Sequence, residues 1–202
     1  MLRGRCRYCH QRIPWEYPLV ELSTGLLFTL IFIFTGGNWW GIFLTLVSIP
    51  LLIIFLFDLK YFLIPSQVVY PTLVGVLLFW LSLDLYYKTS LFSLSSHLNV
   101  SLLGLISMGG FLGLLHLFTK GKGMGLGDVE LGMLLGAILG WPLSIVALFL
   151  SFSIGAILGI VLIVFKRKTW QSAVPFGPLL VLGTSLALVG GDQLIRWYTS
   201  FL

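Results

Sequence analysis

Charged residues are scarce in this chain, and their scarcity excludes a soluble domain of this size. Only 9% of its 202 residues are charged, whereas an average globular chain is about 25% charged. Cysteine is also rare, because Cys6 and Cys9 are the only two, and in a cytosolic segment we expect no disulfide between them. No cleavable signal peptide is visible, so we expect the first apolar run to remain in the mature protein.

Most residues of the chain are apolar. The hydrophobic fraction is 58%, and the mean hydropathy is +1.04. Aromatic residues reach 15%, with seven Trp, which suits side chains anchored at the two interfaces of a bilayer. The net charge of +5 comes from cations in short loops, where they orient helices, so we predict a lipid bilayer and no nucleic acid as the partner.

Seven apolar segments meet or approach the roughly 20 residues that a transmembrane helix needs. They cover residues 18–35, 39–57, 68–86, 100–118, 128–141, 143–165 and 177–198. The fifth is short and glycine-rich, and it ends at Trp141-Pro142, a natural turn. We predict an all-α polytopic membrane protein of about seven transmembrane helices. Residues 1–17 form a short basic segment, and residues 18–202 form one transmembrane domain.

The positive charges predict how these helices are oriented. With a cytosolic N-terminus, ten of the twelve cations fall on the cytosolic side and only Lys88 and Arg196 on the other. Short cytosolic loops carry such an excess of Lys and Arg. The ten are Arg3, Arg5, Arg7, Arg12, Lys60, Lys120, Lys122, Lys166, Arg167 and Lys168.

Two of the seven acidic residues differ from the rest in their context. Asp58 closes the second span and Asp128 opens the fifth, so the predicted topology puts both at the cytosolic end although 70 residues separate them. Asp128 follows Gly125 and Gly127, which permit positive φ and let another backbone approach closely. Taken alone, Asp128 is equally well read as a helix cap. For Asp84, at the outer end of its span, we expect simple solvation.

Two carboxylates that meet can share one proton, because like charges about 3 Å apart cannot both ionise. One then acts as general base on a water while the other, protonated, polarises a carbonyl oxygen. This is aspartic-protease chemistry. The glycines beside Asp128 leave space for an extended peptide, and we predict that Asp58 and Asp128 cut a peptide at the membrane–cytosol boundary.

Four blocks resemble one known family, the type IV prepilin peptidases, which are intramembrane aspartic proteases. The fullest block is Gly123–Trp141, GMGLGDVELGMLLGAILGW, which resembles the G-x-G-D segment of that family. The other three, in the family's order along the chain, are RCRYCHQRIPWEYPLVELSTGLLF, DLKYFLIPSQVVYP and VPFGPLL. Two positions depart from the family pattern, because Ser66 replaces an acid and Glu130 replaces a lysine.

The resemblance implies an aspartic endopeptidase, with residues 18–202 as its peptidase domain and Asp58 and Asp128 as its catalytic pair. It implies that single-span prepilins or pseudopilins are the substrates, and that their basic leaders are cut at the cytosolic face of the cytoplasmic membrane. No cofactor is implied for proteolysis. The products serve type IV pili and protein secretion. The family often also methylates the new N-terminus with S-adenosylmethionine, but this activity is linked with a cytosolic region mostly absent here, so we predict weak or no methyl transfer.

The cysteines raise the question of zinc. Similar full-length proteins carry a first C-x-x-C before this one, and the two pairs together bind zinc. A tetrahedral structural site needs four ligands, and His10 is badly placed beside Cys9 as a third. We therefore favour a reduced pair, Cys6 and Cys9, without metal; a zinc site shared between the two chains of a homodimer stays open.

Two alternative functions from other classes of protein remain open. A transporter or channel would use its membrane carboxylates to bind cations or relay protons, with acids spread along a path through the bilayer. Asp58 and Asp128 instead lie at one face of the predicted bundle. A catalytically inactive factor of pilus or secretion assembly would keep the fold, and the two intact aspartates argue against it.

Overall fold

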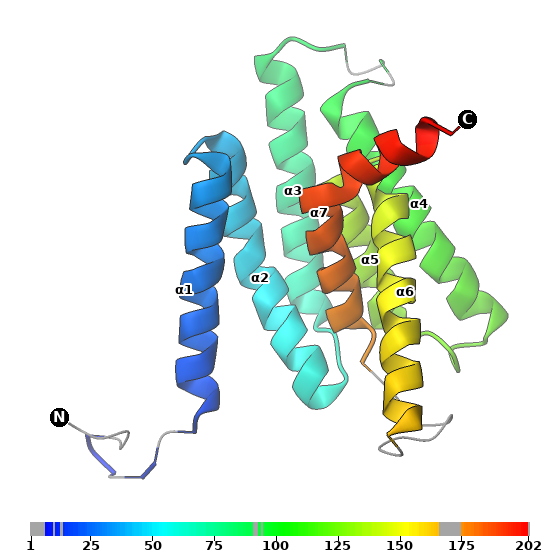
Figure 1. The fold of residues 1–202 in the computed structure, drawn as a ribbon. Helices are drawn as coiled ribbons and strands as arrows, with labels where there is room; N and C mark the ends of the chain where they lie inside the picture. Colours follow the sequence, from blue (N-terminus) through cyan, green and yellow to red (C-terminus); the bar gives the residue numbers. More distant parts are fainter. Residues whose placement is uncertain are drawn as a thin grey trace. The chain divides into compact units, whose positions relative to one another are not determined.

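The computed structural model describes residues 7–9, 11, 12, 14–90, 93, 95–165 and 175–201. These residues form seven α-helices, which confirms the all-α prediction, with bounds within four residues of those expected (Figure 1). The helices are α1 (Glu16–Thr35), α2 (Trp39–Tyr61), α3 (Ser66–Tyr86), α4 (His97–Phe118), α5 (Leu126–Leu139), α6 (Leu143–Val164) and α7 (Gly177–Thr199).

Six of these helices are long and apolar enough to cross a membrane, and α5 is the exception. With 14 residues, α5 is about 21 Å long, against about 30 Å for the hydrocarbon core of a bilayer. The chain is therefore a multi-pass membrane protein, and α5, the segment that the sequence already marks as short, is the one of the seven predicted spans that is not long enough to cross.

The chain divides into two compact units, residues 1–52 and 53–202, and the boundary falls inside α2. In the first unit, α1 ends at Gly36, whose left-handed conformation (φ 64°) lets its N–H bond to the carbonyl of Phe32. The second unit contains the end of α2 and all of α3 to α7, and it carries the residues of the candidate site.

Helix α5 forms the centre of the second unit. It contacts α3, α4, α6 and α7, and nearly all of its residues from Val129 to Leu139 are buried. A helix that is apolar on every side is typical of a protein core or a membrane span, and here the neighbouring helices cover it. The close packing on α4 depends on Gly104 and Gly136, because a Cβ on either residue would overlap the backbone of the other.

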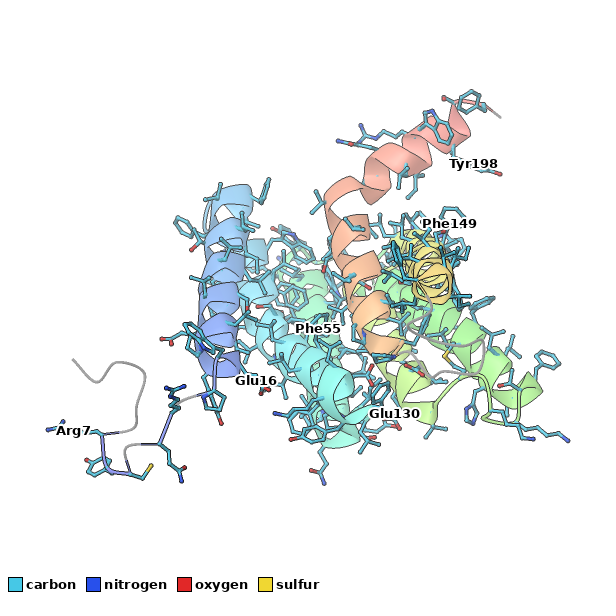
Figure 2. The ribbon with its side chains drawn as sticks, turned by 60° about the horizontal axis from the view of Figure 1, so that its bottom comes forward. Arg7, Glu16, Phe55, Glu130, Phe149 and Tyr198 are labelled. Carbon is cyan, nitrogen blue, oxygen red and sulfur yellow. The ribbon has the colours of Figure 1, made fainter. Side chains whose placement is uncertain are left out.

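Large apolar side chains cover the outside of the helices. Phe149 on α6 is 70% exposed, and Tyr198 near the end of α7 is 64% exposed (Figure 2). A soluble monomer rarely carries so extensive an apolar surface. The bilayer supplies the cover that this surface needs.

Candidate functional site

Asp58 lies in the last turn of α2 and is buried, with 5% of its surface exposed. Its Oδ2 accepts a hydrogen bond of 2.9 Å from the backbone N–H of Gly177, the first residue of α7. The N-terminus of a helix attracts negative charge, because its first N–H groups have no partner within the helix. The start of α7 therefore fixes one oxygen of the Asp58 carboxyl.

Gly177 is required at this position for a steric reason. A Cβ added to it would lie 2.6 Å from Oδ2 and 3.2 Å from Cγ of Asp58. The block from Val174 to Leu180 contributes to the family resemblance, but the sequence did not predict that Gly177 belongs to the site. The position of Gly177 inside the P-F-G-P motif is the sequence signal that could have indicated its role in the site.

Asp128 is the third residue of α5, so it lies in the first turn, as expected. Its Oδ2 accepts a 3.1 Å hydrogen bond from the N–H of Gly125, the residue that caps the helix. Asp128 lies outside the six candidate spans and is half-buried. Burial raises the pKa of its carboxyl to about 6; the hydrogen bond from Gly125 opposes this rise, and the negative charge of Asp58 adds to it.

Ile64 connects the surroundings of the two aspartates. A Cβ on Gly127 would lie 2.9 Å from Cβ of Ile64, and a Cβ on Gly177 would lie 3.4 Å from Cδ1 of the same side chain. The link from α2 to α3, the start of α5 and the start of α7 therefore meet around one isoleucine. Figure 1 shows the ends of α2, α4 and α6 at the lower end of the view. Asp58 and Asp128 thus lie within electrostatic range of each other.

The two glycines before Asp128, Gly125 and Gly127, do not have the positive φ that we expected of them from the sequence. Neither Gly125 nor Gly127 has a positive φ; Gly121, earlier in the loop, does, at 76°. Gly125 has an extended conformation, and Gly127 is already helical. Close approach, the other reason offered for glycine, does apply to Gly127, but the neighbour is the Ile64 side chain and not a backbone.

Glu130 occupies a different side of α5. It is 7% exposed (labelled in Figure 2), and its Oε1 accepts a 3.1 Å hydrogen bond from the hydroxyl of Tyr70 on α3. Its Oε2 is buried and has no hydrogen-bond partner among the described residues. Glu130 therefore points away from Asp128 toward a neighbouring helix, as 200° of helical rotation predicts.

Asp84 corrects one expectation, because it is fully buried and not solvated. Its carboxylate accepts hydrogen bonds from the N–H groups of His97 and Leu98 and from the hydroxyl of Thr89, and it pairs with Nδ1 of His97 at 2.8 Å. The first two bonds cap the N-terminus of α4 from another helix. The role of Asp84 is therefore structural.

The predicted cysteine pair is only partly described. Cys9 is exposed and forms no disulfide with any described residue, and Cys6 lies outside the described residues. Within the ranges that the structure describes, no three His, Cys, Asp or Glu side chains are grouped as a metal would need. The reduced pair without metal stays a prediction, and a zinc site shared between two chains stays an open alternative.

Family models match most of the chain. A model described as the type IV leader peptidase family matches residues 44–160, which include Asp58 and Asp128. A second, described as the bacterial peptidase A24 N-terminal domain, matches residues 1–35. No solved structure matches the chain.

Curated relatives align over nearly the whole chain. All three below are named prepilin leader peptidase/N-methyltransferase. The protein of Aeromonas hydrophila is 36% identical over 100% of this chain and 68% of its own length. That of Pseudomonas aeruginosa is 34% identical over 99% of this chain and 67% of its own length. That of Bacillus subtilis is 32% identical over 97% of this chain and 75% of its own length. The chain thus spans about two thirds of the length of the first two relatives.

Proposed function

Because the chain belongs to the type IV leader peptidase family, we propose that it is a membrane aspartic endopeptidase that removes the leader peptides of prepilins or pseudopilins, with Asp58 and Asp128 as its catalytic pair. The observation that carries the proposal is the shared environment of these two carboxyl groups around Ile64. The protein acts in the cytoplasmic membrane and cuts at its cytosolic face.

The two carboxyl groups divide the chemistry of hydrolysis between them. One is ionised and takes a proton from the attacking water, while the other is protonated and donates to the carbonyl oxygen of the scissile peptide. The raised pKa of Asp128 favours a proton on Asp128, which leaves the carboxyl of Asp58, oriented by the N–H of Gly177, to accept the proton of the water. We therefore assign Asp58 as the general base and Asp128 as the general acid in the first step.

The backbone contacts hold both groups ready for this step. One oxygen of each carboxyl is fixed by a backbone N–H, from Gly177 for Asp58 and from Gly125 for Asp128. Groups that are oriented before the reaction lose little entropy when the transition state forms. Half-buried Asp128 stands at the exposed start of α5, where Gly125 and Leu126 leave room for a peptide.

Mass spectrometry of a prepilin co-expressed with this chain tests the proposal. We expect Asp58→Asn and Asp128→Asn each to abolish the loss of the leader mass, while the variants still insert into the membrane. Asp192→Asn is the matched control, because Asp192 is exposed on α7, and it should process normally. Processing by either Asp58→Asn or Asp128→Asn at the normal rate would show that this pair does not carry the reaction.

The same spectra test methyl transfer. The relatives' names include N-methyltransferase, an activity for which S-adenosylmethionine is the donor that the family uses. We expect weak or no methyl transfer by this chain, so the processed prepilin should lack the further methyl increment. A full methyl increment on the product would contradict that expectation and leave the assignment of Asp58 and Asp128 untouched.

A further inference from the structure

An apolar groove of about 720 Å³ lies between α4, α5 and α6. Its walls are almost entirely hydrocarbon, and Figure 1 shows α4 leaning away from α6 toward the end at which α5 begins. Among the side chains that line it are Phe111, Leu114, Leu117, Val129, Met133 and Leu148. In a bilayer, such a groove between helices is open to the apolar part of another membrane segment.

The groove runs along α4 and ends beside the candidate site. Its α4 wall extends from Ile106 to Leu117, about 17 Å at 1.5 Å per residue, which is about three helical turns. At the Leu117 end the wall includes Val129, the residue directly after Asp128. A helix lying in the groove would therefore bring its end to the first turn of α5.

Aromatic contacts connect the same groove to Asp58. Phe111 in the groove wall packs edge-on against Phe152 of α6, with ring centroids 5.9 Å apart. Phe152 in turn contacts Phe176 at 5.0 Å. Phe176 immediately precedes Gly177, whose N–H bonds to Asp58. Asp128 is thus directly adjacent to a residue of the groove wall, whereas Asp58 is connected to the wall through Gly177, Phe176 and Phe152.

Glycines make this groove suitable for a helix. Gly110 and Gly113 are among its lining residues. A Cβ on Gly110 would meet no atom within 4 Å, and one on Gly113 would meet only Val129, at an ordinary 3.6 Å. Small residues on one helix let a second helix approach closely, which is how membrane helices associate without a hydrophobic driving force. Within the part of the chain that the structure describes, the space directly in front of Gly110 is therefore open.

We propose that this groove binds the apolar helix that follows the cleavage site of the substrate, so that the scissile bond is held at Asp58 and Asp128. The proposal rests on the proposed function, because it takes a prepilin as the substrate. A prepilin has a cleavable leader followed by a single membrane span, and the end of the groove at Val129, beside Asp128, selects that span over a second copy of this chain or a lipid.

Filling the groove tests the proposal. Gly110→Leu places four carbons in open space, and we expect it to lower the rate of prepilin processing in proteoliposomes tenfold or more, with Gly110→Ala close to wild type. Gly75→Leu is the matched control, because Gly75 is also an exposed helical glycine with nothing within 4 Å of a Cβ, but on α3. Both Leu variants gain about the same helix propensity, so both should fold. Equal processing by Gly110→Leu and Gly75→Leu would overturn the proposal.

Crosslinking provides a readout that does not depend on cleavage. In an Asp128→Asn background, a photo-reactive residue at position 110 should capture the prepilin, with the crosslink on its apolar helix, and one at position 75 should not. Crosslinks from position 110 to lipid only, or to a second copy of this chain, would also overturn the proposal. If Asp128→Asn still cleaves while position 110 captures the prepilin, the groove assignment holds and the catalytic assignment fails.

Discussion

Replacing Gly177 by alanine should disable the site although glycine carries no side chain for chemistry. The new Cβ would lie 2.6 Å from Oδ2 of Asp58, about 0.8 Å inside the 3.4 Å at which ordinary contacts begin. Its distance to Cγ, 3.2 Å, is also short, so turning the carboxylate alone does not relieve the overlap. The whole carboxyl group must shift, or the start of α7 must.

The size of this shift sets the expected loss. A misplacement of about 1 Å in a catalytic group can cost on the order of 100-fold in rate. We therefore expect Gly177→Ala to lower kcat/KM for prepilin cleavage by about 100-fold. The protein should still fold, because the substitution adds one methyl group and alanine favours helices over glycine.

The assay compares initial rates of leader removal by purified variants in proteoliposomes. Gly190→Ala is the matched control, since Gly190 lies on the same helix and a Cβ there would meet nothing within 4 Å. That variant should process at the wild-type rate. A Gly177→Ala rate within threefold of Gly190→Ala would refute the idea that contact between α7 and Asp58 positions the carboxylate.

The contact of Gly127 with Ile64, the hydrogen bonds of Asp84 and the pKa of Asp128 each give one further prediction. Gly127→Ala, whose Cβ would lie 2.9 Å from that of Ile64, should slow cleavage about tenfold relative to Gly190→Ala; an unchanged rate would contradict the packing. Asp84→Ala should lower the free energy of unfolding by about 2–3 kcal/mol, measured by denaturation in mixed micelles, because it leaves two partly buried N–H groups at the start of α4 without acceptors; unchanged stability would contradict this. Because Asp128 has a raised pKa of about 6, it loses its proton as the pH rises past that value, and cleavage rates measured from pH 5 to 8 should fall above about pH 6; a rate that rises there would contradict Asp128 as the acid.

The helices follow from the sequence because their cause is local. A run of about 20 apolar residues has to satisfy its backbone hydrogen bonds internally in lipid, and the helix is the simplest structure that does so. This is why the spans could be predicted within four residues. The sequence also contained both carboxylates and the glycines that precede Asp128, and the resemblance named Asp58 and Asp128 as a pair.

Distances between helices have no such local cause. That Gly177 holds Asp58, 119 positions earlier, and that Ile64 packs against Gly127 depend on how α2, α5 and α7 pack. Asp84 shows the same limit, since its position near a helix end suggested solvation, and only the return of the chain into α4 buries it. The sequence alone therefore determined the membrane class, the helices and the family resemblance. Packing between helices decided which backbone N–H orients Asp58, that α5 is a buried central helix, and where the groove opens, because each of these depends on neighbours far away in the chain.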